Sequence, residues 1–368
     1  MTYLSLFSGI GGLESSTEKP LLYCEIDAAC HRVLQARSGQ AIPIVPDITK
    51  LHPPAVDVVA GGWPCQDVSV AGKRRGLGGE RSGLVVELVR VAVESGAHSI
   101  VAENVPNLLV MNDGAEFADA LRLFQAAGYS HVGWRTLNAR QFGLPQQRER
   151  IVMVASRYEA VAWSLHREIP ESPHGPGGPF AAGFYWTAGL QGLSYRIGVA
   201  PTLKVGSSLS IASPPAVETD ETVRKLTSSE CLRLQGFDPA AFQDVKAADV
   251  YRMAGNAVAA PVGSFAVDSV LDPQKPDGAL AAFDVIKKNG VLIGGVPYAV
   301  EHAHPKLASN LGEFLEPVAP ELSVRAALGL LTRLDRSGRP CPDSLREKLE
   351  SIAASGEVTA DLQESEIA

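Results

Sequence analysis

Short apolar runs alternate with helical patterns over residues 1–155 of the chain. Three stretches repeat apolar residues at helical spacing: 28–37 (AACHRVLQAR), 82–95 (SGLVVELVRVAVES) and 114–128 (GAEFADALRLFQAAG). Seven runs have the length and apolar content of strands: 3–7, 21–26, 41–45, 56–62, 98–104, 130–139 and 150–155. Strands that alternate with helices of this kind predict an α/β fold with a doubly wound, mainly parallel sheet. The last two strands have no helix between them, which predicts an antiparallel hairpin at one edge.

The rest of the chain changes character twice. Residues 156–213 are rich in glycine, proline and aromatic residues without a period, which predicts a small irregular region suited to recognition. Helical patterns return at 226–237 and 255–271, within a segment 214–272 that we expect to complete the first domain. Residues 273–368 are predicted to be a separate C-terminal appendage with a hairpin (GVLIGGVPYAV), two amphipathic helices and a polar end.

The composition is that of an ordinary globular protein, with 45% hydrophobic and 20% charged residues over 368 positions. No apolar run is long enough to cross a membrane and the first residues lack a signal-peptide pattern, so we expect a cytoplasmic location and no membrane partner. The five cysteines form no CxxC pair, which argues against a zinc cluster or a disulfide framework, and no metal site is predicted. The formal charge of −8 argues against binding polyanions through bulk charge, although it permits a local basic cleft.

A glycine-rich turn follows the first predicted strand. Gly9, Gly11 and Gly12 let the chain turn tightly and let a ligand approach the backbone at the carboxyl edge of the sheet. Glu25 ends the second strand, where an acidic residue binds ribose hydroxyls in dinucleotide folds, and Asp47 follows the third, where it could read an adenine edge. Taken singly, these features are an ordinary turn and two solvated carboxylates. In this order, and without the Gly-Lys-Ser/Thr of a phosphate loop, they predict a nucleoside pocket that fits S-adenosylmethionine.

A cysteine stands at the end of the fourth predicted strand. Cys65 follows Trp63-Pro64 and precedes a glycine-rich basic loop, where positive charge favours a reactive thiolate; the alternative is a small buried hydrophobe. Glu103 ends the fifth strand and should lie beside Cys65 at the same edge of the sheet. An acid there could protonate the ring nitrogen of a heterocycle while the thiolate adds to a ring carbon. Asn104 would orient the acid, although Glu103 taken alone is also a reasonable helix cap.

Three polar side chains alternate at the start of the last strand of this domain. Gln146, Arg148 and Arg150 should face the same side, because side chains two residues apart share a face of a strand. Paired guanidiniums there suit a phosphate and a base carbonyl. The alternative is a surface ladder of ion pairs with Glu149.

These features occur in the order found in one enzyme family. The segments FSGIGG, PCQ, ENV, QQRER (146–150), RLQGF and GNAV resemble the motifs of the DNA cytosine-C5 methyltransferases, over about residues 2–270. The resemblance implies a class I, Rossmann-like methyltransferase fold, S-adenosylmethionine as the cofactor and double-stranded DNA as the partner. It implies that 156–213 is the target-recognition region. We also expect a monomer of phage or bacterial origin, and a companion restriction endonuclease is a natural partner.

The resemblance also implies roles for single residues. Cys65 would add to C6 of cytosine while Glu103 contacts N3 and the exocyclic amine. Arg150 would hold the flipped-out base and Arg148 would support the loop. The implied cofactor contacts are Phe7, Gly9, Ile10, Gly11, Gly12, Glu25, Ile26, Asp47, Ile48, Pro64 and Asn256. The implied DNA contacts are Gln66, Ser69, Lys73, Arg74, Arg75, Arg81 and Gln146.

The chain departs from the family pattern in three places. Asp67-Val68 replace the Pro-Phe that commonly follows PCQ, the first helix is compressed into LESSTEKP, and the recognition region is small. Two alternatives remain beside the DNA methyltransferase. A tRNA cytosine-C5 methyltransferase is disfavoured because that branch commonly departs from PCQ and because this chain has a recognition insert. A catalytically silent DNA-binding protein would be expected to have lost Cys65 or Glu103.

Overall fold

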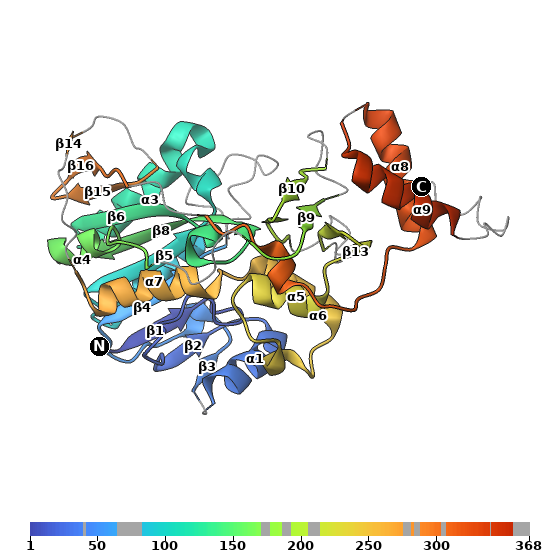
Figure 1. Cartoon of the computed structure of the whole chain (residues 1–368). Helices are drawn as coiled ribbons and strands as arrows, with labels where there is room; N and C mark the ends of the chain where they lie inside the picture. The colour runs from blue at the N-terminus through green and yellow to red at the C-terminus, as the bar shows by residue number, and fades with distance from the viewer. Residues whose placement is uncertain are drawn as a thin grey trace.

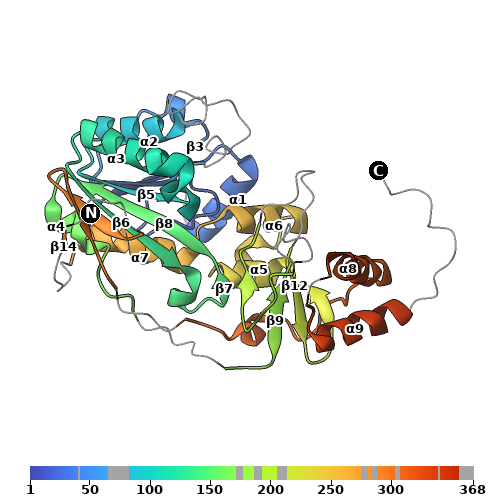
Figure 2. The ribbon, with the colours of Figure 1, turned by 90° about the horizontal axis from the view of Figure 1, so that it is seen from above.

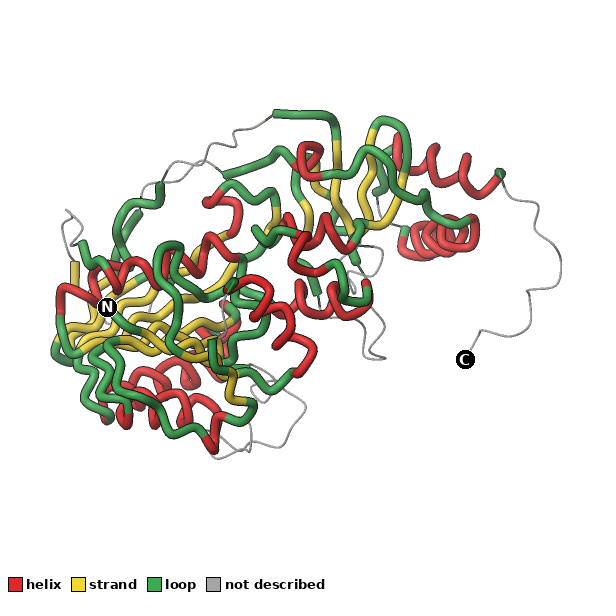
Figure 3. The backbone as a smooth tube through the Cα atoms, turned by 90° about the horizontal axis from the view of Figure 1, so that it is seen from below, coloured by secondary structure: helices red, strands yellow, loops and turns green. Residues whose placement is uncertain are grey.

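Two parts of unequal size make up the molecule, a larger one built on a central sheet and a smaller one beside the sheet's end (Figures 1 and 3). The structure is a computed structural model. It describes residues 1–39, 42–64, 83–170, 177–185, 193–204, 214–274, 281–282, 288–302, 307–338 and 340–355. Within these ranges no helix is both long and apolar enough to span a bilayer.

The central sheet contains the strands predicted for residues 1–155 and three more from the C-terminal segment. Its order is β14-β16-β15-β6-β8-β5-β4-β1-β2-β3. Strands β1 to β5 run parallel, and β8 is antiparallel to both β5 and β6. The mainly parallel, doubly wound fold is therefore confirmed. The strands are β1 (Tyr3–Leu6), β2 (Leu22–Cys24), β3 (Ile44–Val45), β4 (Val58–Gly62), β5 (Ser99–Asn104), β6 (His131–Asn138), β8 (Glu149–Ser156), β14 (Ala281–Ala282), β15 (Gly290–Ile293) and β16 (Val296–Ala299).

Both faces of this sheet are apolar, because successive side chains of a strand point to opposite faces. On β4, Val59 packs in one core cluster, whereas Val58 and Ala60 pack in the cluster on the other face. Helices α2 (Gly83–Glu94) and α3 (Ala115–Ala126) cover the first face, and α4 (Glu159–Ser164) and α7 (Ala260–Leu271) cover the second (Figure 2).

The helices begin and end where local chemistry favours it. Helix α1 (Ala28–Ser38) starts at Asp27, whose carboxylate accepts from the Ala29 N–H at 2.9 Å, and stops at Gly39 with φ of 66°. Helix α5 (Ser228–Leu234) starts with a capping box between Thr227 and Glu230. Helix α6 (Ala247–Asn256) follows, and the short 3₁₀ turns are η1 (Ile48–Lys50), η2 (Pro106–Leu109), η3 (Met111–Gly114), η4 (Ala139–Phe142), η6 (Pro239–Phe242) and η7 (Leu311–Phe314).

No helix forms between β1 and β2, where the sequence predicted a short one. The chain crosses over as a loop, and helix α7 from late in the sequence packs against it. A Cβ at Gly263 of α7 would lie only 1.9 Å from the Gly12 carbonyl oxygen, so glycine is required for this close approach. The Ser15 and Ser16 hydroxyls each donate to Asp268 of α7 at 2.5 Å. The return segment therefore takes the place of the missing helix.

The smaller part is more regular than predicted. A four-stranded sheet of order β10-β9-β12-β13 joins β9 (Ala181–Phe184) and β10 (Arg196–Ile197) to β12 (Ala216–Thr219) and β13 (Val223–Lys225). The predicted boundary at residue 213 is therefore wrong, because it cuts between strands of one sheet. A separate pair of strands, β7 (Gln146–Gln147) and β11 (Ala200–Pro201), links this part to the larger one.

The C-terminal segment 273–368 is not a separate appendage. Its predicted hairpin forms as β15 and β16, but β15 pairs antiparallel with β6 and extends the central sheet. For the same reason the β6–β8 hairpin does not lie at the edge. The chain then crosses to the smaller part, where helices α8 (Val324–Ser337) and α9 (Asp343–Ala354) pack on its sheet (Figure 2).

Candidate active site

A cavity of about 760 Å³ opens where the parallel strands end. Four groups of residues line it: the turn after β1, the ends of β2 and β3, the ends of β4 and β5, and two segments of later sequence, 203–204 and 252–258. In a doubly wound sheet the ligand site lies outside the carboxyl ends of the strands. The sequence-predicted residues from β1 to β5 are thus brought together at one place.

The glycine turn after β1 separates into residues that face the cavity and residues that pack inside the protein. Phe7 and Gly9 have positive φ of 51° and 55°, and a Cβ at Gly9 would meet nothing within 4 Å. Gly11 differs, because a Cβ there would lie 2.4 Å from the Arg37 guanidinium, and Gly11 does not line the cavity. A Cβ at Gly12 would lie 2.3 Å from the Val258 carbonyl oxygen. Gly9 is therefore the position where a ligand can approach the backbone, while Gly11 and Gly12 are needed for packing.

Glu25 and Ile26 form the wall at the end of β2. The Glu25 carboxylate accepts from the backbone N–H groups of Gly9 at 2.7 Å and Asp27 at 2.8 Å. Each of its oxygens retains a second lone pair toward the cavity. Ile26 is 81% exposed although it is large and apolar. An exposed apolar side chain next to a fixed carboxylate suits a flat ring joined to a sugar.

Asp47, Ile48 and Asn256 complete this end of the cavity. Asp47 caps η1 by accepting from the Thr49 hydroxyl at 2.7 Å and the Thr49 N–H at 3.0 Å, and these hydrogen bonds hold the pKa of Asp47 below its usual range. Ile48 is buried behind it, and Asn256 ends α6 with its side chain exposed. These residues fit a nucleoside ligand: carboxylates for polar edges, apolar surface for a ring, and no phosphate loop.

The opposite end of the cavity lies at the ends of β4 and β5. Asn104 is buried and donates from Nδ2 to the Trp63 carbonyl at 3.3 Å, while its Oδ1 accepts from Val105 N–H at 2.8 Å. It thereby ties β5 to the Trp63-Pro64 turn. Pro64 lines the cavity, and Cys65 follows it by one peptide bond.

Glu103 and Arg150 form a largely buried ion pair in the cavity wall. Arg150 Nε lies 2.9 Å from Glu103 Oε1, but the N–H direction does not make a hydrogen bond, and Oε1 is buried without a donor. Burial raises the pKa of Glu103, and the nearby guanidiniums of Arg150 and Arg148 oppose that rise. A buried carboxyl with a raised pKa and an unsatisfied oxygen is arranged to exchange a proton with a ligand.

Arg148 and Gln146 lie beneath the site. Arg148 is buried and donates to the backbone carbonyls of Leu203, Gly255 and Ala257. Burial lowers the pKa of Arg148 well below its usual value. It joins segments that are distant in sequence, which fits the supporting role that the resemblance implied.

Gln146 does not fit its predicted role. Its side chain has no exposed surface, donates from Nε2 to the Leu234 carbonyl at 2.8 Å and accepts from the Leu203 N–H at 3.1 Å. A side chain enclosed in this way makes no DNA contact. Later segments of the chain cover Gln146 and Arg148, whereas Arg150 lines the cavity.

The predicted nucleophile and the predicted loop contacts lie outside the described residues; they are Cys65, Gln66, Ser69, Lys73, Arg74, Arg75 and Arg81. The four described cysteines are free thiols. Burial raises the pKa of every one of them, to about 12 for Cys24, so none is arranged as a thiolate nucleophile.

Some lining residues had no sequence signal. Leu203 and Lys204 come from the irregular region and reach the cavity only because β11 pairs with β7. Arg252 on α6 forms an ion pair with Asp27 at the start of α1. Trp63 is the exception, because a tryptophan between the strand end and Pro64 could have been selected from the motif itself.

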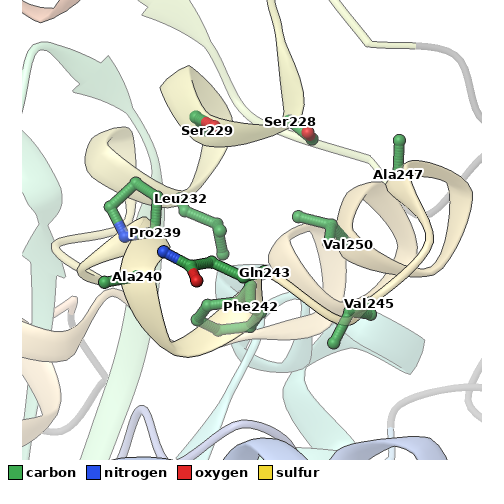
Figure 4. A pocket seen from close by; sticks show the side chains of 10 residues that line it. All are labelled: Ser228, Ser229, Leu232, Pro239, Ala240, Phe242, Gln243, Val245, Ala247 and Val250. Carbon is green, nitrogen blue, oxygen red and sulfur yellow. The ribbon is translucent and has the colours of Figure 1, made fainter.

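A second cavity, of about 420 Å³, lies between α5, η6 and α6 (Figure 4). None of the side chains that line it is ionisable; they are Ser228, Ser229, Leu232, Pro239, Ala240, Phe242, Gln243, Val245, Ala247 and Val250. It therefore holds no acid or base that could activate its two serine hydroxyls, and the ionisable groups of the candidate site lie in the first cavity.

Sequence comparison decides between the remaining classes. The model of the C-5 cytosine-specific DNA methylase family matches residues 1–174 and 186–271. The chain belongs to this family. Type II methyltransferase M2.BsuMI of Bacillus subtilis (strain 168) is 33% identical and covers 91% of this methylase and 94% of the relative. Type II methyltransferase M.BsuFI of Bacillus subtilis is 30% identical, with 78% and 76% covered.

Solved structures agree with the fold of the methylase. The S. pombe Dnmt2 methyltransferase superposes with a TM-score of 0.51 at 16% identity, covering 74% of this chain and 98% of that one. The Entamoeba histolytica methyltransferase EhMeth gives 0.53 at 14% identity, with 74% and 98% covered. The family match ends at 271, but 91% of 368 residues extends beyond that point, so the match to M2.BsuMI includes part of the C-terminal segment.

Proposed function

We propose that this DNA (cytosine-5-)-methyltransferase takes its methyl group from S-adenosylmethionine and acts through a covalent bond between Cys65 and C6 of a cytosine flipped out of duplex DNA. The observation that carries the proposal is Glu103: a buried carboxyl with a raised pKa and an unsatisfied oxygen, in a cavity that is also lined by Pro64, the residue before Cys65 in the sequence. The family supplies the reaction, and the side chains around Glu103 supply its mechanism.

The cofactor would be held at the end of the cavity formed by β1 to β3. Glu25 and Asp47 would accept hydrogen bonds from its sugar and base, Ile26 would contact the ring, and Gly9 leaves room beside the backbone. When bound, S-adenosylmethionine supplies an electrophilic methyl carbon on a sulfonium. Asn256, Phe7 and Ile48 would close the remaining sides.

The protein's own groups would activate the cytosine. The Cys65 thiolate adds to C6, and Glu103 gives its proton to N3, so the π electron pair between C5 and C6 becomes available at C5. After methylation at C5, the C5 proton is lost to a base, the thiolate leaves C6 and the N3 proton returns to Glu103, which restores the aromatic ring and the enzyme. Arg150 would hold the base carbonyl and keep Glu103 in place, and Asn104 fixes the turn that precedes Cys65.

The substrate class follows from the same site. A cytosine inside a duplex cannot reach a thiol at the end of a strand, so the base must leave the stack. The sheet formed by β9, β10, β12 and β13 would select the sequence, and the basic residues after Cys65 would contact phosphates. The names of the type II relatives support a companion restriction endonuclease, and we propose that the enzyme acts as a monomer.

Covalent trapping tests this mechanism. DNA with 5-fluorocytosine at the methylated position should leave the wild type bound to the strand after denaturation, because the fluorine cannot leave as a proton does. Cys65→Ala should lose both trapping and methyl transfer, whereas Cys341→Ala, a thiol far from the strand ends, should keep both. Methyl transfer by Cys65→Ala close to the wild-type rate would refute the adduct, and bisulfite sequencing of the same DNA identifies the target.

A second variant tests the acid. Glu103→Gln keeps the size and hydrogen-bonding capacity of the side chain but cannot deliver a proton. Its single-turnover rate should therefore fall at least about tenfold, since a positioned acid contributes about 10²- to 10⁴-fold. Its cofactor affinity should stay close to wild type, because the proposed cofactor contacts come from other strands. Loss of cofactor binding with an unchanged rate would instead assign Glu103 to the cofactor wall.

A further inference from the structure

One short segment of the smaller part reaches the catalytic cavity and is held there rigidly. Strand β11 pairs with β7, so residues 200–201 lie beside Gln146 and Gln147. Buried Gln146 then accepts from the Leu203 N–H at 3.1 Å, and Arg148 donates to the Leu203 carbonyl at 3.2 Å. The backbone that precedes Lys204 is thereby fixed from below by the larger part.

Tyr185 fixes the same segment from the other side. Its hydroxyl accepts from the Lys204 N–H at 3.2 Å and donates to the Thr202 carbonyl at 3.1 Å. The ammonium of Lys204 lies 4.5 Å from the centre of the Tyr185 ring, over its face. Tyr185 therefore holds both the backbone and the cation of Lys204, and its own side chain is buried.

The position of Lys204 is unusual for a surface lysine. It lines the same cavity as Glu103 and Arg150, and its side chain is exposed. Within the described part of the chain Lys204 is the lysine that lines the cavity, and no carboxylate there lies at ion-pair distance from its ammonium. A cation held in place at a catalytic cavity without a counter-ion is arranged for an anionic ligand.

We propose that Lys204 binds the DNA backbone phosphate next to the flipped cytosine, and that Tyr185 is the positioning residue for this contact. The inference rests on the proposed flipping of the base. A lysine is a point charge suited to phosphate rather than to reading a base edge. Glu103 and Arg150 already face the base, and Lys204 stands on the recognition side, where the strand on either side of an expelled nucleotide must pass.

Salt dependence of DNA binding tests the contact. A duplex carrying the site found by bisulfite sequencing is titrated with each variant between about 50 and 200 mM salt. Lys204→Ala should weaken binding about five- to tenfold and lower the slope of log affinity against log salt by about one, the value expected for one phosphate. Lys204→Arg should restore the slope, and Tyr185→Phe should weaken binding about twofold in the same direction.

Three comparisons keep the result specific. Lys246→Ala removes an exposed lysine that does not line the cavity, and it should leave affinity and slope unchanged. Cofactor affinity should be unchanged in Lys204→Ala; a loss there with normal DNA binding would assign the lysine to the carboxylate of the cofactor and overturn the proposal. An unchanged salt slope in Lys204→Ala would overturn it too. Covalent trapping by Lys204→Ala at saturating DNA should persist, so failure of this proposal is distinct from failure of the Cys65 mechanism.

Discussion

At the scale of single residues, the position of Glu103 depends on the absence of a side chain on the neighbouring strand. Gly62 pairs with Glu103 across β4 and β5, and a Cβ at Gly62 would lie 2.8 Å from Glu103 Oε2. Real Cβ contacts are not this short, so the carboxyl must move if the glycine is replaced. The glycine at the end of the VDVVAGG run is thus required by the acid beside it.

We predict that Gly62→Ala lowers the single-turnover methylation rate at least about tenfold, because it displaces an acid of the kind that contributes 10²- to 10⁴-fold when correctly placed. Cofactor affinity should change little. Gly83→Ala, at a helical glycine where a Cβ would meet nothing within 4 Å, is the matched control and should keep the wild-type rate. If Gly62→Ala methylates DNA as fast as the wild type, the carboxyl does not need its present position.

Glu14 gives a pH-dependent prediction. Burial raises its pKa to about 7, and its carboxyl accepts from the Ser5 hydroxyl at 2.7 Å. The folded protein therefore binds a proton more tightly than the unfolded chain, and the free energy of unfolding should fall as pH rises from about 4.5 to about 7. Glu14→Gln removes this proton, so between pH 5 and pH 8 the wild type should lose about 2 kcal/mol relative to the variant.

Urea unfolding at the two pH values measures this difference. Glu18→Gln, an exposed carboxyl in the same loop, serves as the control and should follow the wild type. If the free energy of unfolding changes with pH by the same amount in the wild type and in Glu14→Gln, Glu14 is already ionised in the folded protein and its pKa is not raised.

The positions of site residues were predictable where one strand end sufficed to place them. Glu25, Glu103 and Asn104 lie where the order of strands put them, because the carboxyl ends of parallel strands meet at one edge. The burial of Gln146 and Arg148 was not predictable, because residues 203, 234 and 255 from distant segments cover them. The alternation of side chains along a strand predicts which face a side chain lies on, but it does not predict which distant segment will cover that face.

At the scale of elements, the long periodic segments were predicted and the short strands were not. Helices α1, α2 and α3 and the strands of the parallel sheet match the apolar runs. Strands β9, β10, β12 and β13 have two to four residues each, too few for a period, and they form a sheet only with partners up to about forty residues away. Helix α6 was missed, since its sequence mixes apolar and charged residues next to the GNAV motif.

This sheet changes how the recognition region should be exchanged. Replacing 156–213 would separate β9 from β12, although these strands pair over four residues, Ala181 to Phe184. We predict that this exchange with a relative yields an unstable protein. Exchanging 177–226 together with 316–355 keeps the sheet with its covering helices and should change which cytosine is methylated.

Bisulfite sequencing compares the two exchanges, and thermal unfolding with cofactor binding shows whether each is folded. A folded protein from the longer exchange with the original target would place sequence selection outside this sheet. If the shorter exchange gives a stable protein that methylates a different cytosine, β12 and β13 are not needed for sequence selection.

At the scale of the whole molecule, the C-terminal segment joins the two parts. It adds β15 to the edge of the central sheet, then crosses to the smaller part, where Leu311 N–H donates to the Gly198 carbonyl at 3.1 Å. Its backbone at Glu316 contacts both members of the buried Arg224–Glu230 ion pair. Sequence patterns predicted the hairpin and both helices but not their partners, because pairing between residues so far apart leaves no local signal.

Helices α8 and α9 complete the core of the smaller part. Leu330, Leu345 and Leu349 are buried against Phe184 and Val223 of its sheet. Lys348 of α9 also donates to the Glu218 carboxylate at 3.0 Å, and Glu218 has no exposed surface. Removing these helices would expose the sheet's apolar face and take away the cation that compensates a buried carboxylate.

We predict that deleting residues 322–368 lowers the free energy of unfolding of the smaller part by roughly 3–5 kcal/mol, from the exposure of Phe184 and Val223 alone. DNA binding should weaken with it, while cofactor affinity stays near wild type because that end of the cavity lies on the central sheet. Deleting only 356–368, the polar acidic end, is the length control and should be silent. Because the longer deletion can fail to fold, Lys348→Met provides a second measurement. It leaves the buried Glu218 carboxylate beside the Tyr195 hydroxyl without its cation and should cost about 3–5 kcal/mol. Arg346→Ala breaks a surface pair with Asp335 and should leave the free energy of unfolding close to wild type. If Lys348→Met and the longer deletion both unfold and bind DNA as the wild type does, the C-terminal helices are not part of the recognition unit.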